Sequence, residues 1–314
     1  MPPDVLEAAC IYINKIKSPL VKFWGGEPLE NRSGIKYALG HARPEKFSVT
    51  TNGICLDEDL YEWLMMHGVE VALSWDGTEE SQNKGRSNTY DELIERLPKW
   101  KNLISANGGQ ILKTVAIPEL LYDDIEEIYN AGFERCFLNF FRAYGVMYTQ
   151  SDMEVLEKQY HRVIKDFHMM PDFTLTDVLQ YQNMWNTTRS NLYVPHCGIN
   201  AQGLAIGPDG MLYPCDDAVI MGENFVIGNV WDGVDVKMNM EIRHQLTCVP
   251  DRCSGCDLKC YPCPVCSWIN RDELAADPGD LFCELRRMQF RVVNQYRMPV
   301  RGHGLTVTPS RLIA

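Results

Sequence analysis

A cluster of cysteines near the carboxy terminus restricts what this chain can fold into more than any other feature. Five thiols lie within the fourteen residues from Cys253 to Cys266. A buried cysteine in a hydrophobic core usually behaves as a single small apolar residue. Zinc sites and iron–sulfur clusters, by contrast, take four thiolates each and are commonly built from C-x2-C steps. The cluster therefore predicts bound metal.

The number of cysteines exceeds what one metal site needs. Nine of the 12 cysteines fall in the last 118 residues, and those outside the cluster are Cys197, Cys215, Cys248 and Cys283. Nine thiols suffice for two four-ligand sites with one left over. Spacing alone leaves both zinc and iron–sulfur open. A disulfide framework is disfavoured, because residues 1–19 show no secretion signal and thiols stay reduced in the cytoplasm.

Length and charge exclude several classes of protein. The 314 residues, 45% hydrophobic and 23% charged, suit a soluble protein with one large domain and a smaller one. A net charge of -12 would repel phosphate backbones, so we expect no nucleic-acid partner. No apolar run approaches the roughly 20 residues of a membrane span. We therefore expect a cytoplasmic protein without a membrane partner.

The first half of the chain alternates between helical and strand patterns. Residues 4–17 predict a helix with Asp4 placed to cap it, and Ser151 with Glu154 predicts a capping box for a later helix. Between them, strands are predicted at Val21–Trp24, Phe47–Thr51, Val69–Trp75, Ile111–Ile117 and Phe137–Phe141. Apolar strands alternating with helices imply an α/β fold whose parallel sheet curls into a barrel or part of one. Chemistry in such folds sits at the carboxyl ends of the strands.

The sequence divides into four parts. Residues 1–168 form the predicted partial barrel, 169–195 a linker, 196–290 a second domain and 291–314 a carboxy-terminal tail. The second domain has short apolar runs and a hairpin signal at Asp209-Gly210. Because it can bury little apolar surface, we expect metal clusters to hold it together.

Four motifs follow predicted strands in a fixed order: Gly25-Gly26-Glu27-Pro28, Thr51-Asn52-Gly53, Ser74-Trp75-Asp76-Gly77 and then Arg86. Singly, each is as well explained by an ordinary turn. As a set they resemble the radical S-adenosylmethionine enzymes, in particular those with a carboxy-terminal SPASM domain. The spacing of Cys197, Gly210 and Cys215 and the later cysteine series resemble that domain as well. The resemblance covers residues 4 to about 290.

The resemblance implies a partial (β/α)6 TIM-like barrel that lacks its first strand, followed by a small iron–sulfur SPASM domain. It implies S-adenosylmethionine as cofactor, with glycine carbonyls and the Glu27 carboxylate on its ammonium and with Ser74 and Arg86 on its carboxylate. Asn52 is expected to shape its turn more than to contact the ligand. The implied cofactor-binding residues are Gly25, Gly26, Glu27, Pro28, Asn52, Ser74 and Arg86.

The same resemblance implies two auxiliary 4Fe-4S clusters. One would use Cys253, Cys256, Cys283 and either Cys260 or Cys263. The other would use Cys197, Cys215 and Cys266, with Cys248 or a substrate atom as its fourth ligand. Asp216 matches a position that acts as a proton acceptor near the substrate in the sulfatase-maturing branch; a turn carboxylate is the plainer interpretation, and Asp217 is an alternative.

One expected feature is missing from this sequence. The family carries C-x3-C-x2-C upstream of its Gly-Gly-Glu-Pro strand, and here only Cys10 precedes Gly25. The same spacing at Cys256, Cys260 and Cys263 lies in the wrong domain, and we interpret it as a coincidence. Either the sequence is truncated, which the retained motifs favour, or the cluster has been lost.

Two functions are therefore predicted. The first is a radical S-adenosylmethionine peptide maturase, acting on a peptide or protein substrate with ferredoxin or flavodoxin as electron donor. The alternative is a non-catalytic, cluster-stabilised scaffold or peptide-binding protein.

Overall fold

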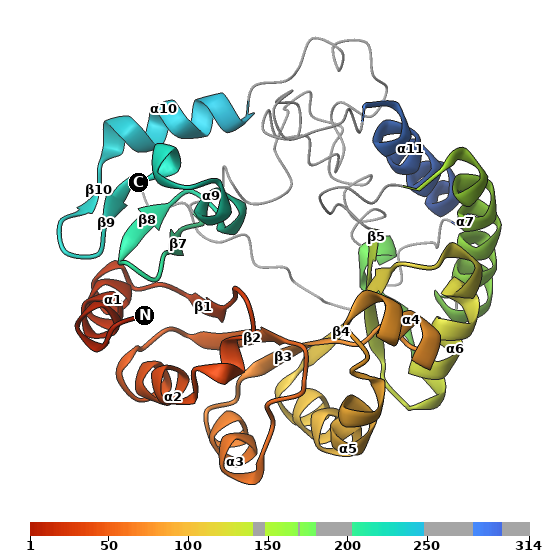
Figure 1. Ribbon diagram of the computed structural model, residues 1–314, viewed down its shortest axis with the longest axis horizontal. Helices are drawn as coiled ribbons and strands as arrows, with labels where there is room; N and C mark the ends of the chain where they lie inside the picture. Colours follow the sequence, from red (N-terminus) through yellow and green to blue (C-terminus); the bar gives the residue numbers. More distant parts are fainter. Residues whose placement is uncertain (141–147, 169, 180–202, 248–278, 297–314) are drawn as a thin grey trace.

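A computed structural model describes residues 1–140, 148–168, 170–179, 203–247 and 279–296. Its larger part is a six-stranded parallel sheet in which every strand lies beside the next one in the sequence (Figure 1). The strands are β1 (Leu20–Phe23), β2 (Lys46–Thr51), β3 (Glu70–Ser74), β4 (Gly109–Val115), β5 (Arg135–Phe140) and β6 (Thr174–Leu175). This sequential parallel order confirms the predicted partial barrel.

Helices cover the outer side of the curved sheet (Figure 1). They are α1 (Pro3–Ile16), α2 (Arg32–His41), α3 (Glu58–Met66), α4 (Glu79–Gly85), α5 (Tyr90–Asn107), α6 (Leu121–Asn130), α7 (Gln150–Val163) and α11 (Gly279–Gln295). The apolar residues of α3, for example, face the strands, and its Leu60 and Leu64 are completely buried.

Side chains alternate across each strand, and the alternation separates a dense outer core from a more open inner face. In β3, Val71 and Leu73 are completely buried against the helices. Lys113 of β4 also points to this side, where its ammonium lies 2.7 Å from the Asp124 carboxylate of α6 and both side chains are sealed from solvent. The inner face of the sheet is left for polar and half-buried side chains such as Thr114.

Three local predictions were wrong. Thr174–Leu175, inside the predicted linker, is the sixth strand and pairs with β5. The capping box of α7 uses Thr149 and Asp152 rather than Ser151 and Glu154. Asp4 lies in the first turn of α1 and does not cap it; the N-cap is Pro2.

The second unit is a four-stranded antiparallel sheet in the order β10-β9-β8-β7. Its strands are β7 (Ala205–Ile206), β8 (Met211–Tyr213), β9 (Gly228–Asn229) and β10 (Gly233–Val234), and its helices are α9 (Asp216–Met221) and α10 (Val236–Thr247). Gly210 turns the predicted β7–β8 hairpin at φ +84°. Ala9 and Tyr12 of α1 belong to the same buried cluster as Leu212 and Ile227, so the unit packs on α1 (Figure 1).

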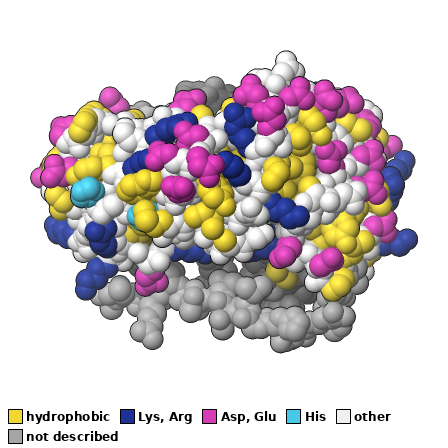
Figure 2. Space-filling view, turned by 90° about the horizontal axis from the view of Figure 1, so that it is seen from below, with side chains coloured by type: hydrophobic (Ala, Val, Ile, Leu, Met, Phe, Trp, Pro, Cys, Tyr) yellow, Lys and Arg dark blue, Asp and Glu magenta, His cyan; other side chains and the backbone are white. Residues whose placement is uncertain are grey.

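The surface of the barrel is mixed in charge. Figure 2 shows acidic and basic side chains lying among apolar ones on one face. The start of α3 shows how such a surface forms, with three ion pairs to neighbouring elements: Arg32–Asp57, Lys36–Asp59 and Lys99–Glu58. Within the described residues, no helix combines the length and the apolar character that crossing a bilayer requires.

Candidate functional site

The turn after β1 is open on its glycine side. Gly25 adopts φ +117°, which favours glycine, whereas Gly26 has ordinary backbone geometry. A Cβ built on either residue would meet no other atom within 4 Å. Backbone groups at this turn are therefore accessible to a ligand.

Glu27 connects this turn to the end of β2. One carboxylate oxygen accepts hydrogen bonds from the Leu29 amide at 3.0 Å and from the Thr51 hydroxyl at 2.7 Å, and the other accepts from the Asn52 amide at 2.6 Å. This structural role was not anticipated from the sequence. A carboxylate has about four acceptor positions, so one remains for an external donor.

The turn after β2 is shaped by its own side chains. The Asn52 carboxamide oxygen accepts the Ile54 amide hydrogen at 3.0 Å, which is the turn-forming role expected of Asn52. Gly53 has φ +84° and its carbonyl accepts a hydrogen bond from the Trp100 indole at 2.9 Å. The Asn52 side-chain oxygen therefore stabilises its own turn.

Arg86 lies at the carboxyl end of β3 and is held there by Asp76. Its Nε donates to Asp76 Oδ2 at 2.9 Å, and its Nη2 donates to Asp76 Oδ1 at 3.2 Å and to the Thr114 hydroxyl at 3.0 Å. Nη1 makes no hydrogen bond to the described residues. Ser74, which is 8% exposed, also has a hydroxyl without such a partner there. These two groups can therefore receive a ligand.

The second unit brings a carboxylate to the inner side of β1. Asp216 begins α9 and is exposed. Partial desolvation of the ammonium lowers the pKa of Lys22 on β1, although the residue is exposed at the surface, and the charges of Asp216 and Glu70 oppose that shift. Asp216 is therefore close enough to Lys22 to act on its charge. Lys22 and Thr114 belong to none of the sequence motifs. Only the alternation of side chains along β1 and β4 could have placed them on the inner face of the sheet.

Most of the predicted metal ligands lie outside the described residues: Cys197, Cys253, Cys256, Cys260, Cys263 and Cys266, together with Cys248. Cys215 precedes α9 and Cys283 lies on α11, both half-buried. In the described ranges, no group of three or more His, Cys, Asp or Glu side chains is arranged to hold a metal.

A basic side chain lies near Cys215. Burial lowers the pKa of the Arg243 guanidinium, and the charge of the neighbouring Cys215 opposes that shift. Of the three cysteines in the first half of the chain, Cys10 and Cys136 are buried in the barrel core, and Cys55 lies half-buried in the turn after β2.

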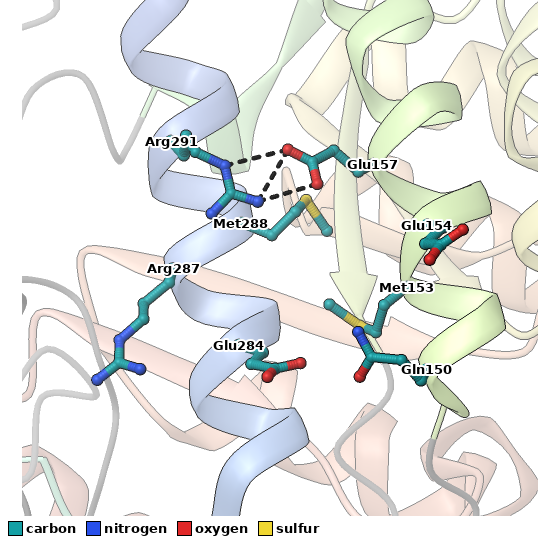
Figure 3. Close-up of a pocket in the computed structure, with 8 residues that line it drawn as sticks. All are labelled: Gln150, Met153, Glu154, Glu157, Glu284, Arg287, Met288 and Arg291. Atoms are coloured by element: carbon teal, nitrogen blue, oxygen red, sulfur yellow. Dashed lines mark hydrogen bonds and ion pairs between the residues drawn. The ribbon is translucent and has the colours of Figure 1, made fainter.

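A pocket of about 290 Å³ lies apart from these turns, between α7 and α11 (Figure 3). Met153 and Met288 line it together with Glu154 and Glu284. At its edge, Arg291 pairs with both oxygens of Glu157 at 2.9 Å. The ion pair fastens α11 to the outer helical layer.

Comparison with known proteins supports this picture of the fold. The structure of native anSMEcpe with bound AdoMet and Cp18Cys peptide matches with a TM-score of 0.71 and 18% identity, over 95% of this chain and 92% of that chain. Streptococcus suis SuiB bound to precursor peptide SuiA matches with a TM-score of 0.55 and 16% identity, over 85% and 64% of the two chains. These similarities show that the chain shares the fold of those two proteins.

A sequence relative points in the same direction. The radical SAM cyclopropyl synthase TigE of Paramaledivibacter caminithermalis is 23% identical over 257 residues, which are 72% of this chain and 50% of TigE. The chain thus spans about half the length of this curated relative. No family model matches the chain.

Proposed function

We propose that the protein is a radical S-adenosylmethionine enzyme that modifies a peptide or protein substrate. The observation that carries this proposal is the convergence of Gly25 after β1, Ser74 at the end of β3 and Arg86, which Asp76 holds, at one edge of a parallel sheet. The fold match to anSMEcpe with bound AdoMet and peptide extends over 95% of the chain and supports it.

The residues at this edge fit the two charged ends of the methionine moiety. The open Gly25 and Gly26 backbone and the remaining acceptor position of Glu27 suit the ammonium. The Ser74 hydroxyl and Arg86 Nη1 suit the carboxylate. Arg86 is already oriented by Asp76, so it would bind without losing much side-chain freedom.

Iron–sulfur chemistry belongs to the proposal as well. A 4Fe-4S cluster next to the cofactor would supply the one electron for its reductive cleavage. The family holds that cluster with C-x3-C-x2-C, and this sequence contains no such segment upstream of Gly25. We assign the carboxy-terminal cysteines to two auxiliary clusters and the protein to the cytoplasm. The cysteines are Cys197, Cys215, Cys253, Cys256, Cys266, Cys283 and either Cys260 or Cys263. Ferredoxin or flavodoxin would deliver the electrons.

Asp216 is the proposed proton acceptor. It is exposed, it starts α9, and its charge acts on Lys22 at the inner side of β1. This places a carboxylate of the second unit beside the barrel strand that leads into the glycine turn. A substrate side chain held between the two units would be within its reach.

Cofactor cleavage is the direct test of the proposal. Two proteins are reconstituted anaerobically with iron and sulfide. One is the 314-residue chain, and the other is a version extended upstream to include any C-x3-C-x2-C segment. Both are then treated with a strong reductant and S-adenosylmethionine, and 5'-deoxyadenosine is measured. The extended protein is expected to form it; its failure, with clusters fully loaded, contradicts the proposal.

The second candidate is a cluster-stabilised scaffold or peptide-binding protein without catalysis. Cofactor cleavage by the 314-residue chain alone would exclude it. Iron and acid-labile sulfide analysis, with a visible spectrum, would separate either candidate from a protein with zinc sites, because zinc thiolates are colourless.

A further inference from the structure

The inner face of β1 carries large side chains that the proposed function does not use. Phe23 stacks on Phe47 with ring centroids 5.9 Å apart, on the side of the helices. Because side chains alternate along a strand, Leu20, Lys22 and Trp24 face the other way. Leu20 is 48% and Trp24 is 51% exposed, and Lys22 is exposed as well. We call these three residues the β1 inner row.

Lys22 is the charged member of this row, and its charge is only partly compensated. Its Nζ lies 4.0 Å from the centroid of the Trp24 ring. A cation–π contact of this kind attracts the ammonium but supplies no hydrogen-bond acceptor. Among the described residues, no carboxylate lies within ion-pair distance of Nζ and no acceptor takes a hydrogen bond from it. Asp216 and Glu70 act on it only from a longer distance.

The neighbouring strand leaves this ammonium accessible. Lys22 lies in register with Ser48 of β2, and Ser48 lies in register with Glu70 of β3. Ser48 is small, so the side chain next to Lys22 on the sheet does not cover it. Trp24 directly precedes Gly25, which places the row next to the open glycine turn.

We propose that Lys22, held in place by Trp24, binds a carboxylate group of a ligand inside the barrel. The carboxylate would belong to an acidic side chain of the substrate peptide. The exposed Trp24 ring would cover the apolar carbons next to that carboxylate. This inference rests on the proposed function and adds a specificity-determining cation to it.

Arg86 does not already fill this role. Two of its three guanidinium nitrogens are engaged by Asp76 and Thr114, and it follows β3 rather than β1. The site would therefore contain two cations that differ in how many hydrogen bonds they already make to the protein. Arg86 is fixed by the protein, whereas Lys22 keeps its hydrogen-bond donors for the ligand.

The experiment compares the wild-type chain with Lys22→Met, Lys22→Arg and the control Lys237→Met. Lys237 has a side chain that is 87% exposed on α10, so its replacement gives the same change in net charge far from the sheet edge. Each protein is immobilised anaerobically and offered a pool of random peptides containing Asp and Glu. A matched pool carries Asn and Gln instead. S-adenosylmethionine affinity is measured on the same proteins by calorimetry.

We expect Lys22→Met to lower retention of the acidic pool about tenfold, the usual effect of losing one charge-assisted hydrogen bond. Retention of the neutral pool should not change. Lys22→Arg should keep most of the binding, and Lys237→Met all of it. Cofactor affinity should be the same in all variants; a loss of cofactor affinity with unchanged retention of the acidic pool would contradict the assignment to the substrate.

Two negative results have different meanings. If the wild-type chain retains the acidic pool and Lys22→Met retains it equally well, the carboxylate site is wrong and the proposed function stands. If the wild-type chain retains neither pool, the carboxylate site is wrong, and the proposed function is decided separately by cofactor cleavage in the extended protein. Thermal unfolding of each variant is expected to match the wild type, since Lys22 is exposed; a variant that unfolds early is replaced by Lys22→Gln.

Discussion

Asp76 holds the guanidinium of Arg86 through both of its carboxylate oxygens, with Nε at 2.9 Å from Oδ2 and Nη2 at 3.2 Å from Oδ1. The Asp76 side chain has no exposed surface, whereas that of Arg86 is 22% exposed. The Thr114 amide donates to the same carboxylate at 2.7 Å. A buried anion therefore fixes the plane of a cation that reaches the edge of the sheet.

Asp76→Asn is expected to destabilise the protein because it leaves Arg86 without its charged partner. Breaking a buried ion pair costs about 3–5 kcal/mol, and we expect the lower end because Arg86 keeps some contact with solvent. Urea unfolding measures the change. The control Glu157→Gln breaks an exposed ion pair with Arg291, and such pairs contribute about 0–1 kcal/mol. Equal losses in the two variants would contradict the role given to Asp76.

Glu27→Gln tests whether Glu27 stabilises the fold in addition to any contact with a ligand. Glutamine has one acceptor oxygen and cannot serve the Leu29 and Asn52 amides and the Thr51 hydroxyl together. We expect a loss of about 1–3 kcal/mol in unfolding free energy without any cofactor present. Glu30→Gln, an exposed neighbour without these contacts, should unfold like the wild type. A wild-type unfolding curve for Glu27→Gln would leave only the ligand role.

The barrel could be predicted from the sequence because its signals are local and repeated. The strand predicted at Val69–Trp75 is found as Glu70–Ser74, and Gly68 after helix α3 has a φ of +59°, a geometry that favours glycine. Strand β6 was missed because its two residues are too few to show the alternation of apolar and polar side chains that marks a strand. The cap of α7 was misplaced because Thr149 and Ser151 are both hydroxyl residues with an acidic residue three positions later.

The candidate site could be predicted only in its turns. Glycines at positive φ are visible in the sequence, since few other residues tolerate that geometry. The partners of Glu27 and Arg86 are not, because they depend on which strand ends become neighbours. Asn52 lies 25 residues from Glu27, and Thr114 lies 28 residues from Arg86. Lys22 and Asp216 are separated further still in the sequence. Their charges interact because the second unit packs on α1.

Gly26→Ala separates the role of the first turn in folding from its role in binding. The added methyl group meets no atom within 4 Å and the backbone needs no positive φ, so stability should stay within about 0.5 kcal/mol of the wild type. The same methyl group would occupy the space where a ligand approaches the backbone. We expect S-adenosylmethionine affinity, measured by calorimetry, to fall several-fold.

Gly40→Ala is the matched control for this methyl addition. Gly40 lies in α2, and a Cβ there also meets no atom within 4 Å. Alanine in a helix is more favourable than glycine by about 0.5–1 kcal/mol, so this variant should be slightly more stable. Its cofactor affinity should not change. Equal affinity in Gly26→Ala and Gly40→Ala would remove the first turn from the binding site.

The raised pKa of Asp177 makes the stability of the folded protein depend on pH. It is 2% exposed, and burial raises its pKa to about 7 despite hydrogen bonds from the Leu138 amide and the Tyr160 hydroxyl. In the unfolded chain an Asp has a pKa of about 3.9. Between these values the folded protein binds the extra proton, so its stability falls as the pH rises from about 4 to about 7 and then levels off.

Asp177→Asn removes this titration and imitates the protonated acid. Urea unfolding of both proteins at a series of pH values gives the difference in their stability. Because all other groups titrate alike in the two, the difference reports Asp177 alone. Stability of the wild type relative to Asp177→Asn should decline through that pH window, by up to about 4 kcal/mol. A difference that is independent of pH would show that Asp177 titrates at the same pH in both states, contrary to its burial between β5 and α7.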